Sequence, residues 1–149
     1  MSTLTREELA AETGARLAEL AADPARIDFA VGLVRDTLNG TIDALAANRS
    51  LRTSDKKTLA ERARDYLAIV EAGAAGVRAA VCGAPSDAPV SEREVALRRY
   101  QGRAANAFRF MSSNIMRILP RDPTERGWML DGYALAVAGL AAPREAGAA

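Results

Sequence analysis

Apolar residues recur at intervals of three and four along nearly the whole of this 149-residue chain. This spacing places them on one face of an α-helix, and no segment shows the polar and apolar alternation of a half-buried strand. The pattern therefore predicts an all-α protein with five helices, over residues 5–22, 24–48, 54–82, 91–119 and 123–142.

The predicted helices begin at sequences that are typical of helix N-termini. A capping box places Ser or Thr three residues before Glu, and an Asp-Pro pair places a capping carboxylate directly before the first helical turn. These sequences are Thr5 with Glu8, Asp23 with Pro24, Ser54 with Asp55, Ser91 with Glu94, and Asp122 with Pro123.

The second predicted helix contains the pair Asn39-Gly40, which ordinarily marks a turn. Apolar residues nevertheless keep helical spacing across the pair, and one glycine costs only about 1 kcal/mol relative to alanine inside a helix. We predict one continuous helix, with a kink at the glycine as the alternative.

The domain organisation follows from the length of these helices and the absence of linkers. We expect one domain over residues 1–142, in which the long helices pack side by side as an elongated bundle, and a flexible tail over residues 143–149. The chain has no apolar stretch of the roughly 18 residues that a membrane span needs, and no apolar signal core near its start. We expect a cytoplasmic protein that does not contact membranes.

The composition excludes several kinds of chemistry. Histidine is absent and Cys82 is the only cysteine, which rules out imidazole-thiolate zinc sites, histidine triads and intrachain disulfides. Glu8 with Glu12, and Glu61 with Asp65, have the spacing to share a cation, but we interpret both pairs as solvated helix faces. We predict no catalytic residue, no metal and no cofactor.

The segment 91–119 separates apolar from basic side chains at helical spacing. The expected core side comprises Leu97, Tyr100, Ala104, Phe108, Met111, Ile115, Ile118 and Leu119. Guanidinium groups pair with phosphates, and an exposed aromatic ring can stack on a base. The candidate partner or nucleic-acid surface on the other side comprises Arg98, Arg99, Arg103, Asn106, Arg109, Phe110, Asn114 and Arg117.

Charge supports this surface only regionally, because 20 basic residues nearly balance 19 acidic ones over the chain. Residues 91–126 hold eight arginines and four acids, whereas residues 1–40 hold four arginines and seven acids. Two alternatives remain open. The acidic first helix can dock against the basic fourth helix, and Phe110 can pack against another helix.

The last predicted helix is apolar around its whole circumference, and Asp131 is its only charge from Gly127 to Ala142. Such a helix lies in the middle of the bundle, or a partner covers one of its sides. We expect an arginine of the fourth helix to pair with Asp131. The candidate dimer interface comprises Trp128, Met129, Tyr133 and Leu140.

Small residues in two of the predicted helices indicate close helix crossings. They are residues 73, 74, 76, 79 and 80 of the third helix, and Gly132 and Gly139 of the fifth.

These observations favour a non-enzymatic helical interaction protein that self-associates, or binds a protein partner, and presents an arginine-rich helix face. The alternative is a nucleic-acid-binding subunit of a nucleoprotein assembly, and a small carboxylate-dependent enzyme is a minor alternative. The sequence indicates no small-molecule ligand.

Overall fold

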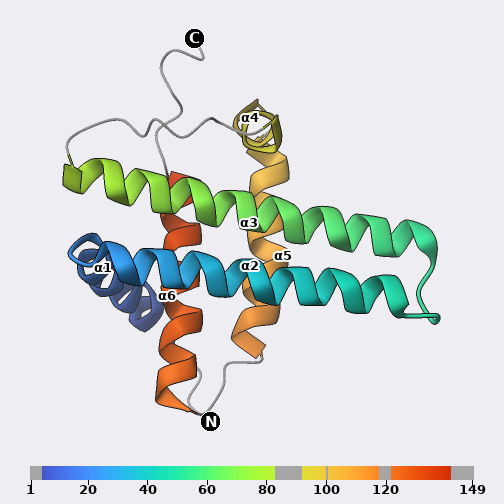
Figure 1. Ribbon diagram of the computed structural model, residues 1–149, viewed down its shortest axis with the longest axis horizontal. Coiled ribbons are helices and arrows are strands. Elements are labelled where there is room, and N and C mark those ends of the chain that lie inside the picture. The colour runs from blue at the N-terminus through green and yellow to red at the C-terminus, as the bar shows by residue number, and fades with distance from the viewer. Residues whose placement is uncertain (1–4, 83–91, 100, 118–121, 142–149) are drawn as a thin grey trace.

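The computed structural model describes residues 5–82, 92–99, 101–117 and 122–141, and within these ranges every regular element is an α-helix (Figure 1). The predicted all-α fold is confirmed, while the predicted tail lies outside the described residues. The helices are α1 (Arg6–Ala21), α2 (Pro24–Ala47), α3 (Thr53–Cys82), α4 (Glu92–Arg99), α5 (Gln101–Arg117) and α6 (Pro123–Ala141).

The capping sequences begin the first two helices as predicted. The Thr5 hydroxyl accepts a hydrogen bond from the Glu8 amide at 3.1 Å, and Asp23 accepts one from the Arg26 amide at 3.3 Å. Helix α2 then continues through Asn39 and Gly40, so the prediction of one continuous helix is confirmed.

The single helix predicted over residues 91–119 is wrong, because α4 ends at Arg99 and α5 begins at Gln101. Figure 1 shows α4 turned across the end of α5. In a straight helix, ten residues would separate Arg93 from Arg103 by about 15 Å along the axis. In the structure both arginines donate hydrogen bonds to the same carboxylate oxygen, Oδ1 of Asp65, and the change of direction brings them together.

The helices do not all run side by side. Helices α2 and α3 form an antiparallel pair, α5 and α6 run across this pair, and α1 packs beside α6 (Figure 1). The expected alignment of the fourth helix with the second and third is therefore not found, because α5 runs across the pair and α4 contacts only α3 and α5 among the described helices. None of the helices in the described ranges is long and apolar enough to span a membrane.

Helix α6 occupies the middle of the molecule, where it contacts α1, α2, α3 and α5. Ala134, Leu135 and Ala136 are completely buried. Of the two predictions for this apolar helix, the central position is confirmed.

The crossing of α3 and α6 depends on two glycines. A methyl group at Gly73 would overlap the Leu135 carbonyl, and a methyl group at Gly139 would overlap the Ile69 carbonyl. The prediction of close helix approach is thus confirmed at these positions, whereas Gly76 faces open space.

Candidate functional site

Asp131 of α6 lies at the centre of a buried ion-pair cluster. Arg26 of α2 donates two hydrogen bonds to its carboxylate, from Nε at 2.8 Å and from Nη2 at 2.9 Å. Arg16 of α1 donates a third from Nη1 at 2.9 Å. The hydrogen bonds to Asp131 raise the pKa of Arg26 above its ordinary value. The expected partner from the fourth predicted helix is therefore wrong, because α1 and α2 supply both arginines.

Asp65 of α3 forms a second cluster of the same kind. Arg103 of α5 donates from Nε at 2.7 Å and from Nη2 at 2.9 Å, and Arg93 of α4 donates from Nη1 at 2.8 Å. Asp65 is buried, so its predicted place on a solvated helix face is wrong. A carboxylate with two guanidinium partners has its charge balanced inside the protein.

Glu61 extends this cluster toward solvent. Arg93 donates a hydrogen bond to its carboxylate at 2.9 Å, and this bond holds the pKa of Glu61 below its ordinary value of 4.5. Hydrogen bonds to the carboxylates in turn raise the pKa of both Arg93 and Arg103. Among the described residues, no three acidic or cysteine side chains come together in a way that could hold a metal ion.

The predicted arginine surface is only partly external. Arg99, Asn106 and Arg109 are exposed, but Arg103 is bound to Asp65. Phe110 is half-buried, with the guanidinium of Arg62 5.0 Å from its ring centre, so it packs against α3 as the alternative interpretation expected. The side chains of Arg98, Asn114 and Arg117 lie outside the described part of the structure.

The acidic first helix does not dock against the basic segment. Within the described residues, α1 contacts α2, α3 and α6 but neither α4 nor α5. The regional charge difference therefore does not correspond to a contact between these helices.

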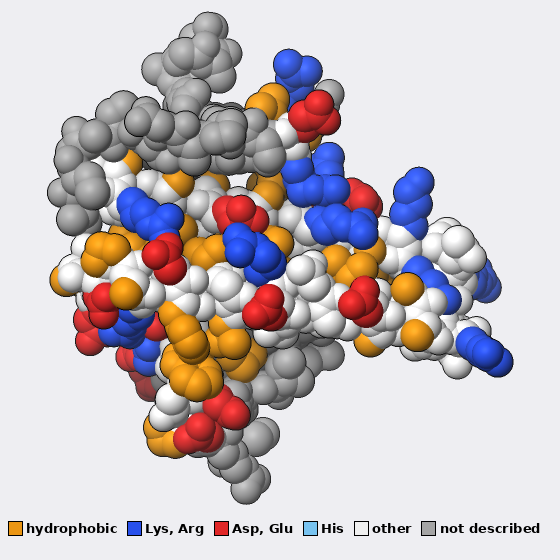
Figure 2. Space-filling view, viewed as in Figure 1, with side chains coloured by type: hydrophobic (Ala, Val, Ile, Leu, Met, Phe, Trp, Pro, Cys, Tyr) orange, Lys and Arg blue, Asp and Glu red, His pale blue; other side chains and the backbone are white. Residues whose placement is uncertain are grey.

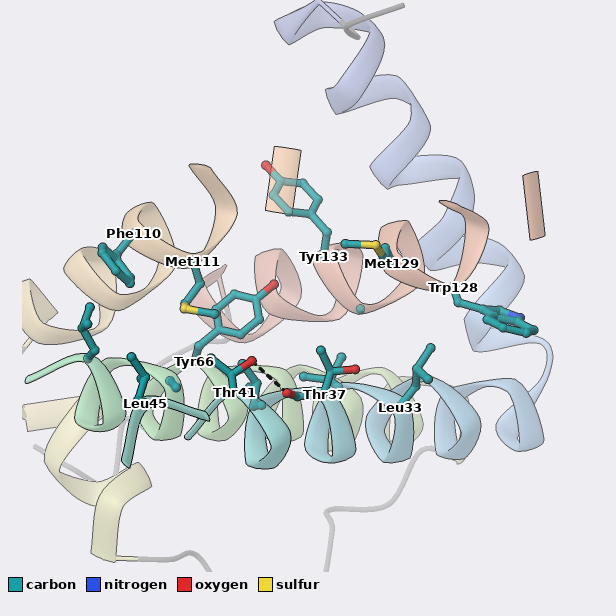
Figure 3. Close-up of a pocket in the computed structure, with 15 residues that line it drawn as sticks. Leu33, Thr37, Thr41, Leu45, Tyr66, Phe110, Met111, Trp128, Met129 and Tyr133 are labelled. Carbon is teal, nitrogen blue, oxygen red and sulfur yellow. Dashed lines mark hydrogen bonds between the residues drawn. The ribbon is translucent and has the colours of Figure 1, made fainter. Parts of the chain in front are cut away.

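An apolar cleft of about 340 Å³ opens between α2, α3, α5 and α6 (Figure 3). Aliphatic, aromatic, methionine and threonine side chains line it, and none of the described lining residues is charged. Three of the four predicted interface residues, Trp128, Met129 and Tyr133, belong to this lining. Leu140 is 39% exposed and lies outside the cleft.

Tyr66 of α3 carries the one polar side-chain atom in the described residues that is buried without a hydrogen-bond partner, its hydroxyl oxygen. Burial raises the pKa of Tyr66, and nearby Tyr133 adds to the effect. Figure 3 shows Tyr66 extending into the space between α2 and α6, whereas Tyr133 points away from α2. The ring of Tyr133 lies 5.6 Å from that of Phe108.

At one end of the cleft, two large aromatic side chains reach the surface. Phe29 of α2 is 50% exposed and Trp128 of α6 is 37% exposed, and their ring centres are 5.2 Å apart. Leu33, one helical turn after Phe29, is half-buried and lines the cleft. We call Phe29, Leu33 and Trp128 the aromatic surface. Figure 2 shows a group of hydrophobic side chains on the surface below α2, over the part of the molecule where Figure 1 places α6.

Sequence reasoning missed Arg16, Arg26, Phe29 and Tyr66 as candidate site residues. The lone acid in an apolar helix signalled a buried ion pair, but spacing along the chain does not identify its partners. The sequence contains no sign that the Tyr66 hydroxyl would be buried without a partner.

Comparison with known proteins adds no functional assignment: no family model, curated protein or solved structure matches the chain significantly.

Proposed function

We propose that this chain is a non-enzymatic helical interaction protein that self-associates through the aromatic surface. The observation that carries the proposal is the exposed pair of Phe29 and Trp128, packed against each other across two helices. Large aromatic side chains dominate the binding energy of protein interfaces, and their exposure in water is unfavourable.

A second copy of the chain is the partner that requires no further component. In a twofold symmetric dimer the same patch meets itself, so the Phe29 and Trp128 rings of one copy would cover those of the other. The cleft beside Trp128 adds apolar area to this face. Tyr133 packs against Phe108 and Leu140 lies elsewhere, so of the four predicted interface residues Trp128 is central to this proposal.

The nucleic-acid alternative receives less support. The guanidinium of Arg103 forms an ion pair with Asp65, and the ring of Phe110 packs beside Arg62 rather than being free for a base to stack on it. We therefore do not propose nucleic-acid binding as the function.

The proposal is tested by measuring molecular mass in solution across a wide range of protein concentration. We expect a dimer that dissociates on dilution, and we expect Trp128→Ala to weaken it. Loss of an interface hot spot costs about 2 kcal/mol or more, which corresponds to a rise in the dissociation constant of roughly 30-fold.

Leu140→Ala is the matched control, since Leu140 is a similarly exposed hydrophobic residue of the same helix but lies outside the cleft. It should leave the dissociation constant unchanged. A parent chain that stays monomeric at every concentration, or equal effects of both substitutions, would contradict the proposal.

A further inference from the structure

We propose that the cleft between α2, α3, α5 and α6 binds a small, uncharged, mainly apolar molecule that carries one hydrogen-bond acceptor, which receives the Tyr66 hydroxyl proton. The inference goes beyond self-association and does not depend on it. It also departs from the expectation, based on sequence alone, that no small-molecule ligand is indicated.

The size of the cleft fits such a ligand. Its volume of about 340 Å³ lies in the range of small-molecule sites, which are apolar hollows with a few placed polar groups. Its walls come from four helices, so packing holds its shape (Figure 3). A hollow of this kind, with side chains such as Leu33, Leu38 and Met111 on its walls, offers little to hold ordered water.

The hydroxyl of Tyr66 differs from the threonine hydroxyls of the lining, because Thr37 and Thr41 are exposed whereas Tyr66 is buried. Only 1% of this residue is exposed, and within the described residues the hydroxyl has no hydrogen-bond partner. A buried donor without a partner has lost its bonds to water and gained none in return. A ligand acceptor placed between α2 and α6 restores one hydrogen bond to this group.

The charge of the ligand follows from the composition of the walls. The described lining residues include no lysine, arginine, aspartate or glutamate. A carboxylate in this cleft would lose its hydration without gaining a cation, which is strongly unfavourable. The favoured acceptor is therefore a neutral oxygen, such as the carbonyl of a ketone or an ester.

The test compares three ligands of equal chain length, which are 2-octanone, octanoate and 1-octene. Trp128 is the only tryptophan of the chain and lines the cleft, so its fluorescence reports binding when it is measured at a protein concentration too low for self-association. We expect 2-octanone to bind more tightly than 1-octene by roughly fivefold, the size of one net hydrogen bond. Octanoate should bind least.

Three variants test which residues cause the tighter binding of 2-octanone. Tyr66→Phe deletes only the hydroxyl and should abolish the advantage of the ketone over the alkene. Tyr133→Phe removes a hydroxyl that points away from α2 and should preserve that advantage. Thr37→Phe fills the cleft from an exposed position and should weaken all three ligands.

Two results would overturn the proposal. One is the absence of saturable 2-octanone binding to the parent chain, and the other is an unchanged ketone preference in Tyr66→Phe. Because the mass of the chain is measured separately, failure of ligand binding is distinguishable from failure of self-association.

Discussion

Asp131 and Asp65 are buried to the same extent and have the same kind of partners, although they lie on different helices. Each accepts hydrogen bonds from two arginines that come from two other helices. A buried charge is tolerated only when it is paired and hydrogen-bonded. The two clusters therefore tie α1 and α2 to α6, and α4 and α5 to α3, at fixed points.

Removal of the negative charge of Asp131 should show how much its ion-pair cluster contributes to the stability of the fold. We expect Asp131→Asn to lower the free energy of unfolding by about 3 kcal/mol, because two partly buried arginines, Arg16 and Arg26, lose the buried carboxylate that both contact. Urea denaturation measures the change.

Asp28→Asn is the matched control for this prediction. Asp28 also pairs with an arginine, Arg78, but its side chain is 71% exposed. Since solvent screens such a pair, we expect a loss below about 1 kcal/mol. Similar losses in the two variants would show that burial of Asp131 adds nothing to its pairing.

Glu61 should make stability depend on acidity. Its pKa in the folded protein lies below the ordinary value of 4.5, so the unfolded chain binds a proton more readily than the folded one. The stability that Glu61 contributes is fully present above pH 4.5, and it is lost as the pH falls through the lower pKa of the folded state.

We therefore expect the Glu61→Gln variant to lose less stability than the parent chain when unfolding is followed from neutral to acidic pH. Glu71→Gln is the control, since the ion pair of Glu71 with Arg35 is exposed and long, at 4.0 Å. An identical acid dependence in the parent chain and in Glu61→Gln would contradict this assignment.

At the scale of the helices, the crossing of α3 and α6 brings the backbones of the two helices close together. Alanine favours a helix over glycine by about 1 kcal/mol, but a methyl group at Gly73 or Gly139 would overlap backbone atoms of the facing helix. Overpacking of this kind typically costs about 1–3 kcal/mol. We expect Gly73→Ala and Gly139→Ala to lower the thermal midpoint of unfolding.

Gly76→Ala provides the control on the same helix, because a methyl group there would meet open space. This substitution should raise the midpoint, as the higher helix propensity of alanine acts without a steric penalty. If all three substitutions raised the midpoint, the proposed steric overlap at Gly73 and Gly139 would be contradicted.

The helices differ in how far the sequence could predict them. The starts of α1 and α2 depend on residues close together in the chain, such as Thr5 with Glu8, so local patterns predict them. The sequence contains no proline and no glycine pair near the change of direction between α4 and α5, so local patterns did not predict it. The change of direction accompanies the hydrogen bonds that Arg93 and Arg103 donate to Asp65 of α3, which lies 28 and 38 residues away in the chain.

At the scale of the whole molecule, regional charge proved a poor guide to the surface. Residues 91–126 carry an excess of arginine, but Arg93 and Arg103 pair with Asp65 and Glu61 of the same chain. A count of charges along the chain cannot separate such internal pairs from charges that face a partner. The arginine surface was therefore predicted larger than the described structure supports.

The cleft and the aromatic surface are likewise properties of the assembled molecule. Phe29 and Trp128 are 99 positions apart in the chain, and the two rings meet only because α2 packs against α6. The apolar circumference of the last helix made Trp128 a candidate interface residue, but the sequence offered no reason to join it to Phe29 or to a cleft beside Tyr66.

The sequence by itself determined the helical class and most helix boundaries, because periodicity and capping act over a few neighbouring residues. For the apolar last helix it left open a central position or a covering partner, and the tertiary structure decided for the central position. The sequence also indicated that Asp131 needs a basic partner. Only the tertiary structure decided which arginines pair with Asp131 and Asp65, and where α4 departs from α5. It also decided how four helices leave an apolar cleft beside a Tyr66 hydroxyl that has no hydrogen-bond partner among the described residues. These features arise from contacts between residues far apart in the chain, which spacing along one helix does not encode.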